Sequence, residues 1–297
     1  MFDVVIVGGG PAGLSAALVL GRCRRRVRLY DTGTPRNAAA SAIHGYLTRD
    51  GMLPSAFLEA ARAELAAYAI EPVRAPVRGI ERGADRFDVL VGDERVGATI
   101  VLLATGVRDH VPEIPGVADC YGQSVHHCPY CDGWENRDRR IAVLGKGQAA
   151  AGLALSLLTW TRDVTVVTNG PGRVSPASRA RLARHGIGVR EARVRQLEHQ
   201  DGAARALVLT GDERVACDAV FFTGGQSPQA RFAHELGCEF TRKGTVRTDR
   251  LGATCVPGLY VAGDASRDVQ FVIVAAAEGA KAGVAINKLL QAREGHA

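Results

Sequence analysis

The sequence has few aromatic residues (5%), few lysines and no long hydrophobic run. Its most apolar stretches, at 98–104 and 271–277, fall far short of the roughly 18 residues that a membrane span needs. The chain opens directly on a strand-like segment, with neither a basic region nor a small-residue cleavage site, so no secretory signal is evident. We therefore expect no membrane association and a cytoplasmic location. With 46% apolar and 23% charged residues, a length of 297 residues is typical of a globular protein of about two domains.

Positive charge comes almost wholly from arginine. Four lysines, at 146, 243, 281 and 288, stand among 37 basic residues, and the formal net charge is +6. The densest cluster, Arg22 with Arg24, Arg25 and Arg26, falls where a helix should end, and cations are favourable there. No nucleic-acid-binding motif accompanies the cluster, so we expect a solvated surface and no nucleic-acid partner.

The seven cysteines do not suggest a disulfide framework, because their number is odd and five of them are scattered singly. Only Cys128 and Cys131 are close, in a Cys-x-x-Cys arrangement. Two intervening residues let the two sulfurs meet, so such a pair can reversibly form a disulfide. The alternative is half a zinc site, completed by Cys120, His126 or His127. Since there is no second Cys-x-x-Cys pair, we expect no metal.

The N-terminal segment has the pattern of a dinucleotide-binding unit. A strand at 3–7 leads into Gly8-x-Gly10-x-x-Gly13, a helix at 14–20 and a second strand at 27–30. Gly8 makes the turn, Gly10 lets the backbone approach a pyrophosphate, and Gly13 allows close packing of helix on strand. Helix amides would face the phosphates, and Asp31 would accept hydrogen bonds from ribose hydroxyls.

A second unit of the same kind follows. It has a strand at 141–144, a glycine turn at 145–147, a helix to about 160 and a strand at 164–168. Ser175-Pro176 and Ser227-Pro228 each predict the start of a further helix. A strand at 258–264 and a long C-terminal helix then return to the first unit. The pattern predicts an α/β protein with two Rossmann-like, doubly wound domains, the second inserted into the first.

Four motifs together resemble those of the low-molecular-weight thioredoxin reductase family of flavoproteins. They are Gly8-x-Gly10-x-x-Gly13, Ala104-Thr105-Gly106, Cys128-Pro129-Tyr130-Cys131-Asp132-Gly133 and Gly263-Asp264-Ala265. The resemblance implies a homodimer with an FAD-binding domain at 1–111 and 243–297. It also implies an inserted pyridine-nucleotide-type domain at 112–242 that carries the redox pair. The family's flavin contacts carry over to Gly8, Gly10, Gly13, Asp31, Thr105, Gly106, Asp264 and Gln270.

The residues around the redox pair are similar to one branch, the dithiol oxidases that close disulfides in natural products of the gliotoxin and holomycin type. There, as in His126-His127-Cys128, histidine precedes the first cysteine. The reductases carry Gly-Gly-Gly-Asp-Ser-Ala at the pyridine site and His-Arg-Arg after the next strand. This chain has Gly-Lys-Gly-Gln-Ala-Ala at 145–150 and Thr-Asn-Gly at 168–170.

Neither the arginines expected for NADPH nor the acid expected for NADH is therefore present. A 2′-phosphate without a cation loses charge-assisted hydrogen bonds of about 1.5–3 kcal/mol each, so we expect weak NADPH binding or none. Lys146 and Arg173 remain as cations that would compensate.

The resemblance implies an FAD-dependent oxidase that converts a small-molecule dithiol to its intramolecular disulfide, with O2 as acceptor and H2O2 as product. The resemblance also implies that Cys128 faces the substrate and that Cys131 faces the flavin. His127 is our preferred base for the substrate thiol and His126 the second, although each also fits a loop histidine bound to the backbone. Asp132 fits a proton donor or shuttle, and also a turn residue.

Two other functions stay open. One is an NAD(P)H-dependent reductase for thioredoxin or a small disulfide, which the acid directly after Cys131 favours. The other is a flavin-binding redox sensor that signals through a partner without turnover. The three functions predict different electron sources.

Overall fold

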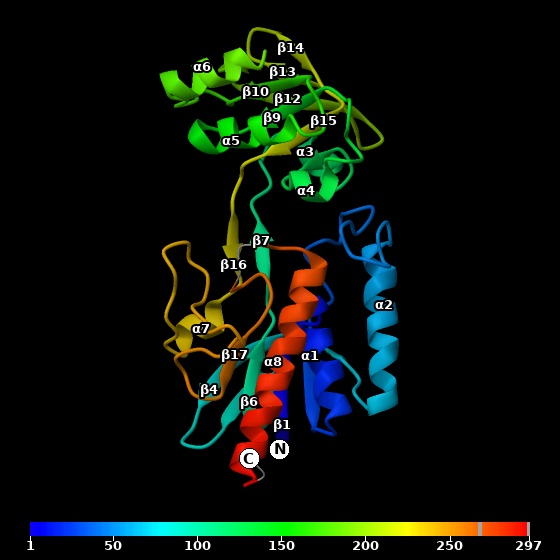
Figure 1. Cartoon of the computed structure of the whole chain (residues 1–297), viewed down its shortest axis with the longest axis vertical. Helices are drawn as coiled ribbons and strands as arrows, with labels where there is room; N and C mark the ends of the chain where they lie inside the picture. Colours follow the sequence, from blue (N-terminus) through cyan, green and yellow to red (C-terminus); the bar gives the residue numbers. More distant parts are fainter. Residues whose placement is uncertain (267–268, 296–297) are drawn as a thin grey trace. The chain divides into compact units, whose positions relative to one another are not determined.

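The computed structural model describes residues 1–266 and 269–295, which form two compact units (Figure 1). Unit 1 comprises Met1–Ala38, Gly45–Arg108 and Ser227–Ala297, and unit 2 comprises Ala39–His44 and Asp109–Gln226. Each unit is built on a sheet with a parallel core and packed helices, so the α/β class with one Rossmann-like domain inserted in another is confirmed. No helix within the described residues is long and apolar enough to cross a membrane.

Unit 1 is built on a sheet with the strand order β3-β2-β1-β6-β5-β4, and β17 pairs with β6 as well. Strands β4 and β5 are antiparallel to their neighbours, whereas the other pairs are parallel. Because both faces of the sheet are covered, the central strand reads as an unbroken apolar run, with Val4, Val5 and Ile6 fully buried. The strands are β1 Phe2–Val7, β2 Val27–Asp31, β3 Val73–Arg74, β4 Val77–Arg82, β5 Phe87–Val91, β6 Glu94–Leu103 and β17 Leu259–Val261.

Three helices cover one face of this sheet, with α1 lying between the other two (Figure 1). They are α1 Pro11–Arg22, α2 Pro54–Leu65, which continues as a 3-10 turn at Ala66–Tyr68, and α8 Val272–Arg293. A Cβ on Gly279 of α8 would meet the Ala12 carbonyl oxygen at 1.9 Å, so the backbones of α8 and α1 touch. The sheet's other face packs against α7 Arg231–Glu235 and the segment after it.

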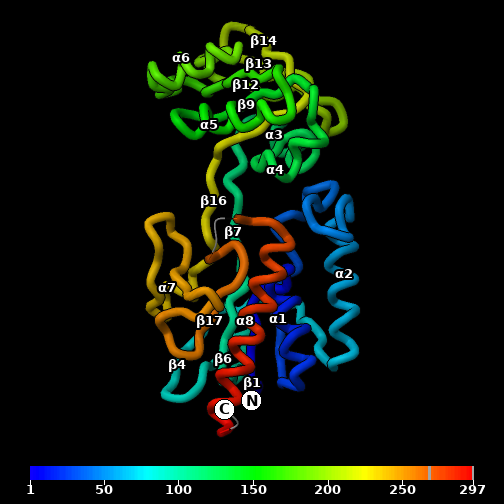
Figure 2. The backbone as a smooth tube through the Cα atoms, viewed as in Figure 1, coloured from blue at the N-terminus to red at the C-terminus, as the bar shows by residue number. Residues whose placement is uncertain are grey.

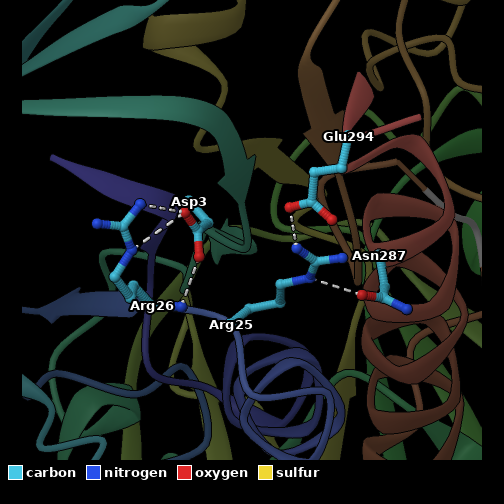
Figure 3. A network of polar contacts seen from close by, with 5 residues as sticks. All are labelled: Asp3, Arg25, Arg26, Asn287 and Glu294. Atoms are coloured by element: carbon cyan, nitrogen blue, oxygen red, sulfur yellow. Dashed lines mark hydrogen bonds and ion pairs between the residues drawn. The ribbon is translucent and has the colours of Figure 1, made fainter. Parts of the chain in front are cut away.

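Two of the clustered arginines are bound to acids and tie the end of α1 to its surroundings (Figure 3). Arg25 Nε donates to Asn287 Oδ1 of α8 at 2.7 Å, and its Nη1 pairs with Glu294. Arg26 donates through its backbone N and its Nη2 to Asp3, at 2.8 and 2.7 Å. These contacts give both arginines a structural role between the end of α1 and the start of β2.

Unit 2 has a parallel sheet with the order β11-β10-β9-β15-β8 and a separate antiparallel sheet, β12-β13-β14. The parallel strands are β8 Val125–His126, β9 Ile141–Leu144, β10 Val164–Val167, β11 Gly188–Arg190 and β15 Ala219–Phe222. The antiparallel strands are β12 Val194–Gln200, β13 Ala203–Leu209 and β14 Arg214–Ala216. The helices are α3 Val117–Cys120, α4 Pro129–Asp132, α5 Gly147–Leu157 and α6 Pro176–Arg184. Ser175 caps α6 by accepting from the Ser178 amide at 3.2 Å, as its sequence predicted.

The chain passes between the units at β7 Val107–Asp109 and at β16 Gln226–Pro228, which pair with each other (Figure 2). The prediction that Ser227-Pro228 starts a helix is wrong. Pairing with β7 keeps this segment extended, and the Gln229 amide donates to the Gly106 carbonyl at 2.8 Å, so the helix begins only at Arg231. Residues 227–242, which the sequence placed in the inserted domain, cluster with unit 1, where Ala233 and Cys238 join its core.

Two glycine substitutions within helices should have opposite effects on the free energy of unfolding, because only Gly279 lies at the contact between α1 and α8. Gly279→Ala should lower the free energy of unfolding by about 1–3 kcal/mol, because the new methyl group has no room beside the Ala12 carbonyl. Gly152→Ala in α5, where nothing lies within 4 Å, should raise it by about 0.5–1 kcal/mol. Chemical denaturation of both variants checks this, and an undiminished stability of Gly279→Ala would contradict the packing.

Candidate functional site

The first glycine turn in unit 1 is shaped by close backbone contacts. Gly8 has φ +110°, and a Cβ on Gly13 would meet the Gly8 carbonyl oxygen at 1.9 Å, so neither position admits a side chain. At Gly10, the residue that precedes α1, a Cβ would meet nothing within 4 Å. The turn is therefore tight on its inner side and open in front of the helix N-terminus, which suits a bound pyrophosphate.

Asp31 lies at the end of β2, where the glycine motif predicts an acid. Its Oδ1 accepts from the Gly9 amide and its Oδ2 from the Gly33 amide, each at 3.0 Å. Arg62 of α2 lies 3.8 Å from Oδ2. A carboxylate accepts about four hydrogen bonds, so Asp31 can hold the turn and still accept from ribose hydroxyls.

Asp264 and Gln270 are brought together by Arg36, which sequence reasoning missed. Arg36 Nη1 donates to Asp264 Oδ2 at 2.8 Å and to Gln270 Oε1 at 2.7 Å. The buried Nε2 of Gln270 has no hydrogen-bond partner among the described residues. A buried amide donor without an acceptor costs about 1–3 kcal/mol, which indicates that a ligand supplies the acceptor.

Thr105 and Gly106 form the turn after β6. The Thr105 hydroxyl donates to the Gln229 carbonyl, and Gly106, with φ +67°, borders open space. Together with the open Gly8–Gly13 turn and the donor of Gln270, this arrangement fits FAD. All the residues that the sequence predicts as flavin contacts therefore belong to unit 1.

In unit 2, the cysteine pair lies at the short helix α4, with Cys128 directly before it and Cys131 within it. Cys128 is the residue that precedes α4, and its carbonyl accepts from the amides of Cys131 and Asp132 at 3.3 and 3.2 Å. The Cys131 thiol donates to the Cys128 sulfur, and with the Cys131 and Tyr130 amides it lowers the pKa of the Cys128 thiol below its ordinary value. Burial and the charge of Asp132 act in the opposite direction. The surroundings of Cys128 therefore favour its thiolate form.

The two histidines before Cys128 are directed to different carboxylates. His126 ends β8 and is 5% exposed, with its Nδ1 3.3 Å from Asp132 Oδ1. The buried Asn136 amide nitrogen lies 3.3 Å from His126 Nε2 and also donates to the Asp132 carbonyl at 2.8 Å. Because this nitrogen is a donor, Nε2 of His126 accepts and Nδ1 carries the proton toward Asp132. His126 thus orients the acid that follows Cys131.

His127 is half-exposed, and its Nε2 lies 3.9 Å from Asp109 Oδ1. The Asp109 side chain is only 5% exposed, and its Oδ2 accepts from the Tyr121 hydroxyl at 3.1 Å. The rings of Tyr121 and Phe222 lie 6.4 and 6.1 Å from the imidazole. Of the two histidines, His127 is the more exposed, which suits a base that meets a substrate.

The second glycine turn differs from the first, because one of its amides is hydrogen-bonded to another segment of the same unit. The Gly147 amide, at the start of α5, donates to the Gly172 carbonyl at 2.7 Å, and Gln148 Oε1 accepts from the Ser178 hydroxyl at 2.8 Å. Glu191 accepts from the Gly172 amide at 3.0 Å and so fixes the covering segment. The Gly147 amide, which would face a pyrophosphate, is therefore already hydrogen-bonded to the loop at 170–173.

No group of three or more His, Cys, Asp or Glu side chains that would hold a metal ion occurs among the residues the structure describes. The cysteines at 128 and 131 therefore lie in a setting of hydrogen bonds and single carboxylates, with Asp132 at one histidine and Asp109 at the other.

Comparisons with known proteins match most of the chain. The family model for pyridine nucleotide-disulphide oxidoreductases matches residues 2–279. Thioredoxin reductase sirT of Leptosphaeria maculans is 30% identical and covers 97% of this chain and 94% of its own length. A probable thioredoxin reductase of Arthroderma benhamiae is 31% identical and covers 90% of this chain and 74% of its own length.

Two solved structures have nearly the same fold. HlmI superposes with a TM-score of 0.95 at 38% identity, over 99% of this chain and 93% of that one. The putative thioredoxin reductase TrxB of Bacillus anthracis gives a TM-score of 0.94 at 31% identity, over 99% and 100%.

The hydrogen bond from Cys131 predicts how the reactivity of Cys128 changes on substitution. In reduced protein, Cys131→Ala should raise the pKa of Cys128 and slow its alkylation by iodoacetamide at pH 7 by about 3- to 10-fold, because a donor to the thiolate is lost. Cys131→Ser keeps a hydroxyl donor and should leave the rate nearly unchanged. Peptide mass spectrometry at Cys128 gives both rates. Faster alkylation in the alanine variant would show that the thiol is not what stabilises the thiolate.

Proposed function

The chain belongs to the pyridine nucleotide-disulphide oxidoreductase family, and we propose that within it the protein is an FAD-dependent dithiol oxidase. It would convert a small-molecule dithiol, of the kind found in natural products, to an intramolecular disulfide through Cys128 and Cys131. The resemblance to thioredoxin reductase-like flavoproteins is confirmed by the matches along the chain. A homodimer in the cytoplasm is part of the proposal.

The observation that carries this proposal is the closed second glycine turn. A reductase needs the N-terminus of α5 for the pyrophosphate of NADPH, but here the Gly147 amide donates to Gly172. Thr168, where the reductases begin their cationic group, is fully buried, and its hydroxyl donates to the Gly170 carbonyl at 2.6 Å. The pyrophosphate of NADPH would thus meet an amide that is already hydrogen-bonded within the chain. This favours a substrate dithiol over NADPH as the source of electrons.

The exchange steps start from the oxidised Cys128–Cys131 pair. His127 takes the proton of one substrate thiol, and the resulting thiolate attacks the Cys128 sulfur, so that the Cys128–Cys131 bond breaks and Cys131 leaves as a thiolate. Asp132, which His126 orients, can relay the proton of the second substrate thiol to the Cys131 thiolate. The second substrate thiolate then attacks the substrate sulfur that is bound to Cys128. Cys128 leaves as a thiolate, for which its lowered pKa is favourable.

These steps leave a cyclic disulfide as product and a reduced cysteine pair. FAD, when bound, would supply the two-electron acceptor for the pair, with O2 as the final acceptor and H2O2 as the product. The residues that would hold FAD are those of the open turn at 8–13 with Asp31, Thr105, Gly106, Asp264 and Gln270.

A second candidate function, an NAD(P)H-dependent disulfide reductase, is favoured by two cations. Lys146 and Arg173 are both exposed and flank the closed turn, where they would meet a phosphate if the loop opened. The acid after Cys131 is compatible with either direction of exchange.

The two functions are separated by the source of electrons. Under anaerobic conditions, dithiothreitol should bleach the bound flavin, whereas NADPH and NADH should do so at least about 100-fold more slowly, because the phosphate-binding interactions are missing. Stopped-flow absorbance at the flavin band measures all three rates. Rapid bleaching by a nicotinamide would transfer the assignment to the reductase, and bleaching by none of the three would favour a sensor.

The exchange chemistry predicts the effect of removing the second sulfur. Cys131→Ser should abolish bleaching by dithiothreitol while FAD stays bound, because no intramolecular disulfide can form. Cys238→Ser, at a buried cysteine of unit 1, serves as the matched control and should bleach normally. Retained thiol-driven bleaching in Cys131→Ser would refute the assigned sulfur chemistry.

A further inference from the structure

We propose that Asp109 and Tyr121 are positioning residues that set the protonation of His127, so that its Nδ1 accepts the proton of the substrate thiol. The proposal rests on the proposed function, in which His127 is the base. No sequence motif marks either residue: Asp109 ends the connecting strand β7, and Tyr121 follows α3. Both lie with His127 in unit 2.

The first step concerns the side of the ring on which the carboxylate lies. Asp109 Oδ1 is 3.9 Å from Nε2, which is beyond hydrogen-bonding distance but within the range of a strong charge interaction. A buried carboxylate at this place favours a proton on Nε2. In the neutral ring the lone pair is then on Nδ1, and this is the nitrogen that can take a proton.

The second step concerns the charge that forms during the reaction. When His127 takes the proton, it becomes an imidazolium, and the nearby carboxylate stabilises that charge. Asp109 is 5% exposed, so water screens the interaction little, and the Tyr121 hydroxyl holds its other oxygen at 3.1 Å. The bond from Tyr121 keeps the carboxylate directed at the ring.

The third step concerns the neighbours of the ring. The neighbours of His127 in the described part of unit 2 include Asp109 of β7, Tyr121 after α3 and Cys128, the next residue in the chain. Phe222 of β15 is apolar, and its ring lies 6.1 Å from the imidazole. Among these neighbours, Asp109 carries the carboxylate, and it lies on the Nε2 side of the ring.

An equivalent pair elsewhere in unit 2 provides a matched control. His199 Nε2 lies 3.5 Å from Asp119 Oδ2, at a shorter distance than in the pair at 127 and 109. Asp119 is exposed, however, and belongs to no part of the proposed exchange. Asp119→Asn therefore removes the same chemical group from a histidine without touching the base.

The test compares Asp109→Asn, Asp109→Glu and Asp119→Asn with the unmodified protein in anaerobic bleaching by dithiothreitol. Asp109→Asn should lower the limiting rate at pH 7 by about 10- to 100-fold, within the roughly 10²–10⁴-fold that a positioned base contributes. The half-saturating dithiol concentration should change by less than about threefold, since no contact to the dithiol is removed. Asp109→Glu keeps the charge and should recover part of the rate, and Asp119→Asn should match the unmodified protein.

A second readout separates positioning from a structural role. Above the pKa of the dithiol, at roughly 8.5 or higher, the substrate forms a thiolate without a base, so the deficit of Asp109→Asn should shrink. A deficit of equal size at pH 7 and at high pH, or a rate at pH 7 within twofold of the unmodified protein, would overturn the proposal. So would Asp109→Glu being as slow as Asp109→Asn.

Folding failure is covered by a milder variant. Tyr121→Phe keeps the carboxylate and removes only its hydrogen bond, and should show a smaller deficit, about 2- to 5-fold, with the same recovery at high pH. A Tyr121→Phe protein that behaves as the unmodified one would remove Tyr121 from the proposal. Failure of the proposed function is distinct, because the unmodified protein itself would then not be bleached by the dithiol.

Discussion

A strand-to-helix turn at the carboxyl end of a parallel sheet leaves backbone amides that require acceptors, and the two units meet this requirement differently. In unit 1, Asp31 accepts from the Gly9 amide, while the space before α1 stays open at Gly10. In unit 2, the carbonyl of Gly172 accepts from Gly147, so the chain satisfies its own turn. The same local fold thus provides a nucleotide cradle in one unit and a closed turn in the other. The assignment of the electron source depends on that difference.

The second constraint is the end of a strand between the two histidines. His126 is the last residue of β8, and His127 follows it at a bend. His126 is buried against Asn136 and Asp132, whereas His127 is half-exposed near Asp109. Each cysteine therefore has one histidine–carboxylate pair beside it in the chain. His126 is paired with Asp132, the residue after Cys131, and His127, which is paired with Asp109, directly precedes Cys128.

Local patterns were enough to predict both strand-turn-helix units, the cap at Ser175 and the long C-terminal helix, because each depends on residues close in sequence. Ser227-Pro228 was misassigned, since pairing between the two connecting strands overrides its helix-starting preference. Arg36 and Asp109 lack a motif of their own. The partner of Arg36 at Asp264 lies 228 residues away, and α3 and β8 separate Asp109 from His127, so only the fold brings them together. The closure of the second turn likewise became visible only in three dimensions.

The proposed oxidase takes its electrons from a substrate dithiol. Aerobic turnover of dithiothreitol by the FAD-loaded protein tests this with no nicotinamide present, when O2 uptake, peroxide and cyclic disulfide are measured together. Oxygen consumed, peroxide formed and disulfide formed should be equal in amount. Turnover that begins only when NADPH is added, and that consumes a disulfide instead of producing one, would contradict the proposal.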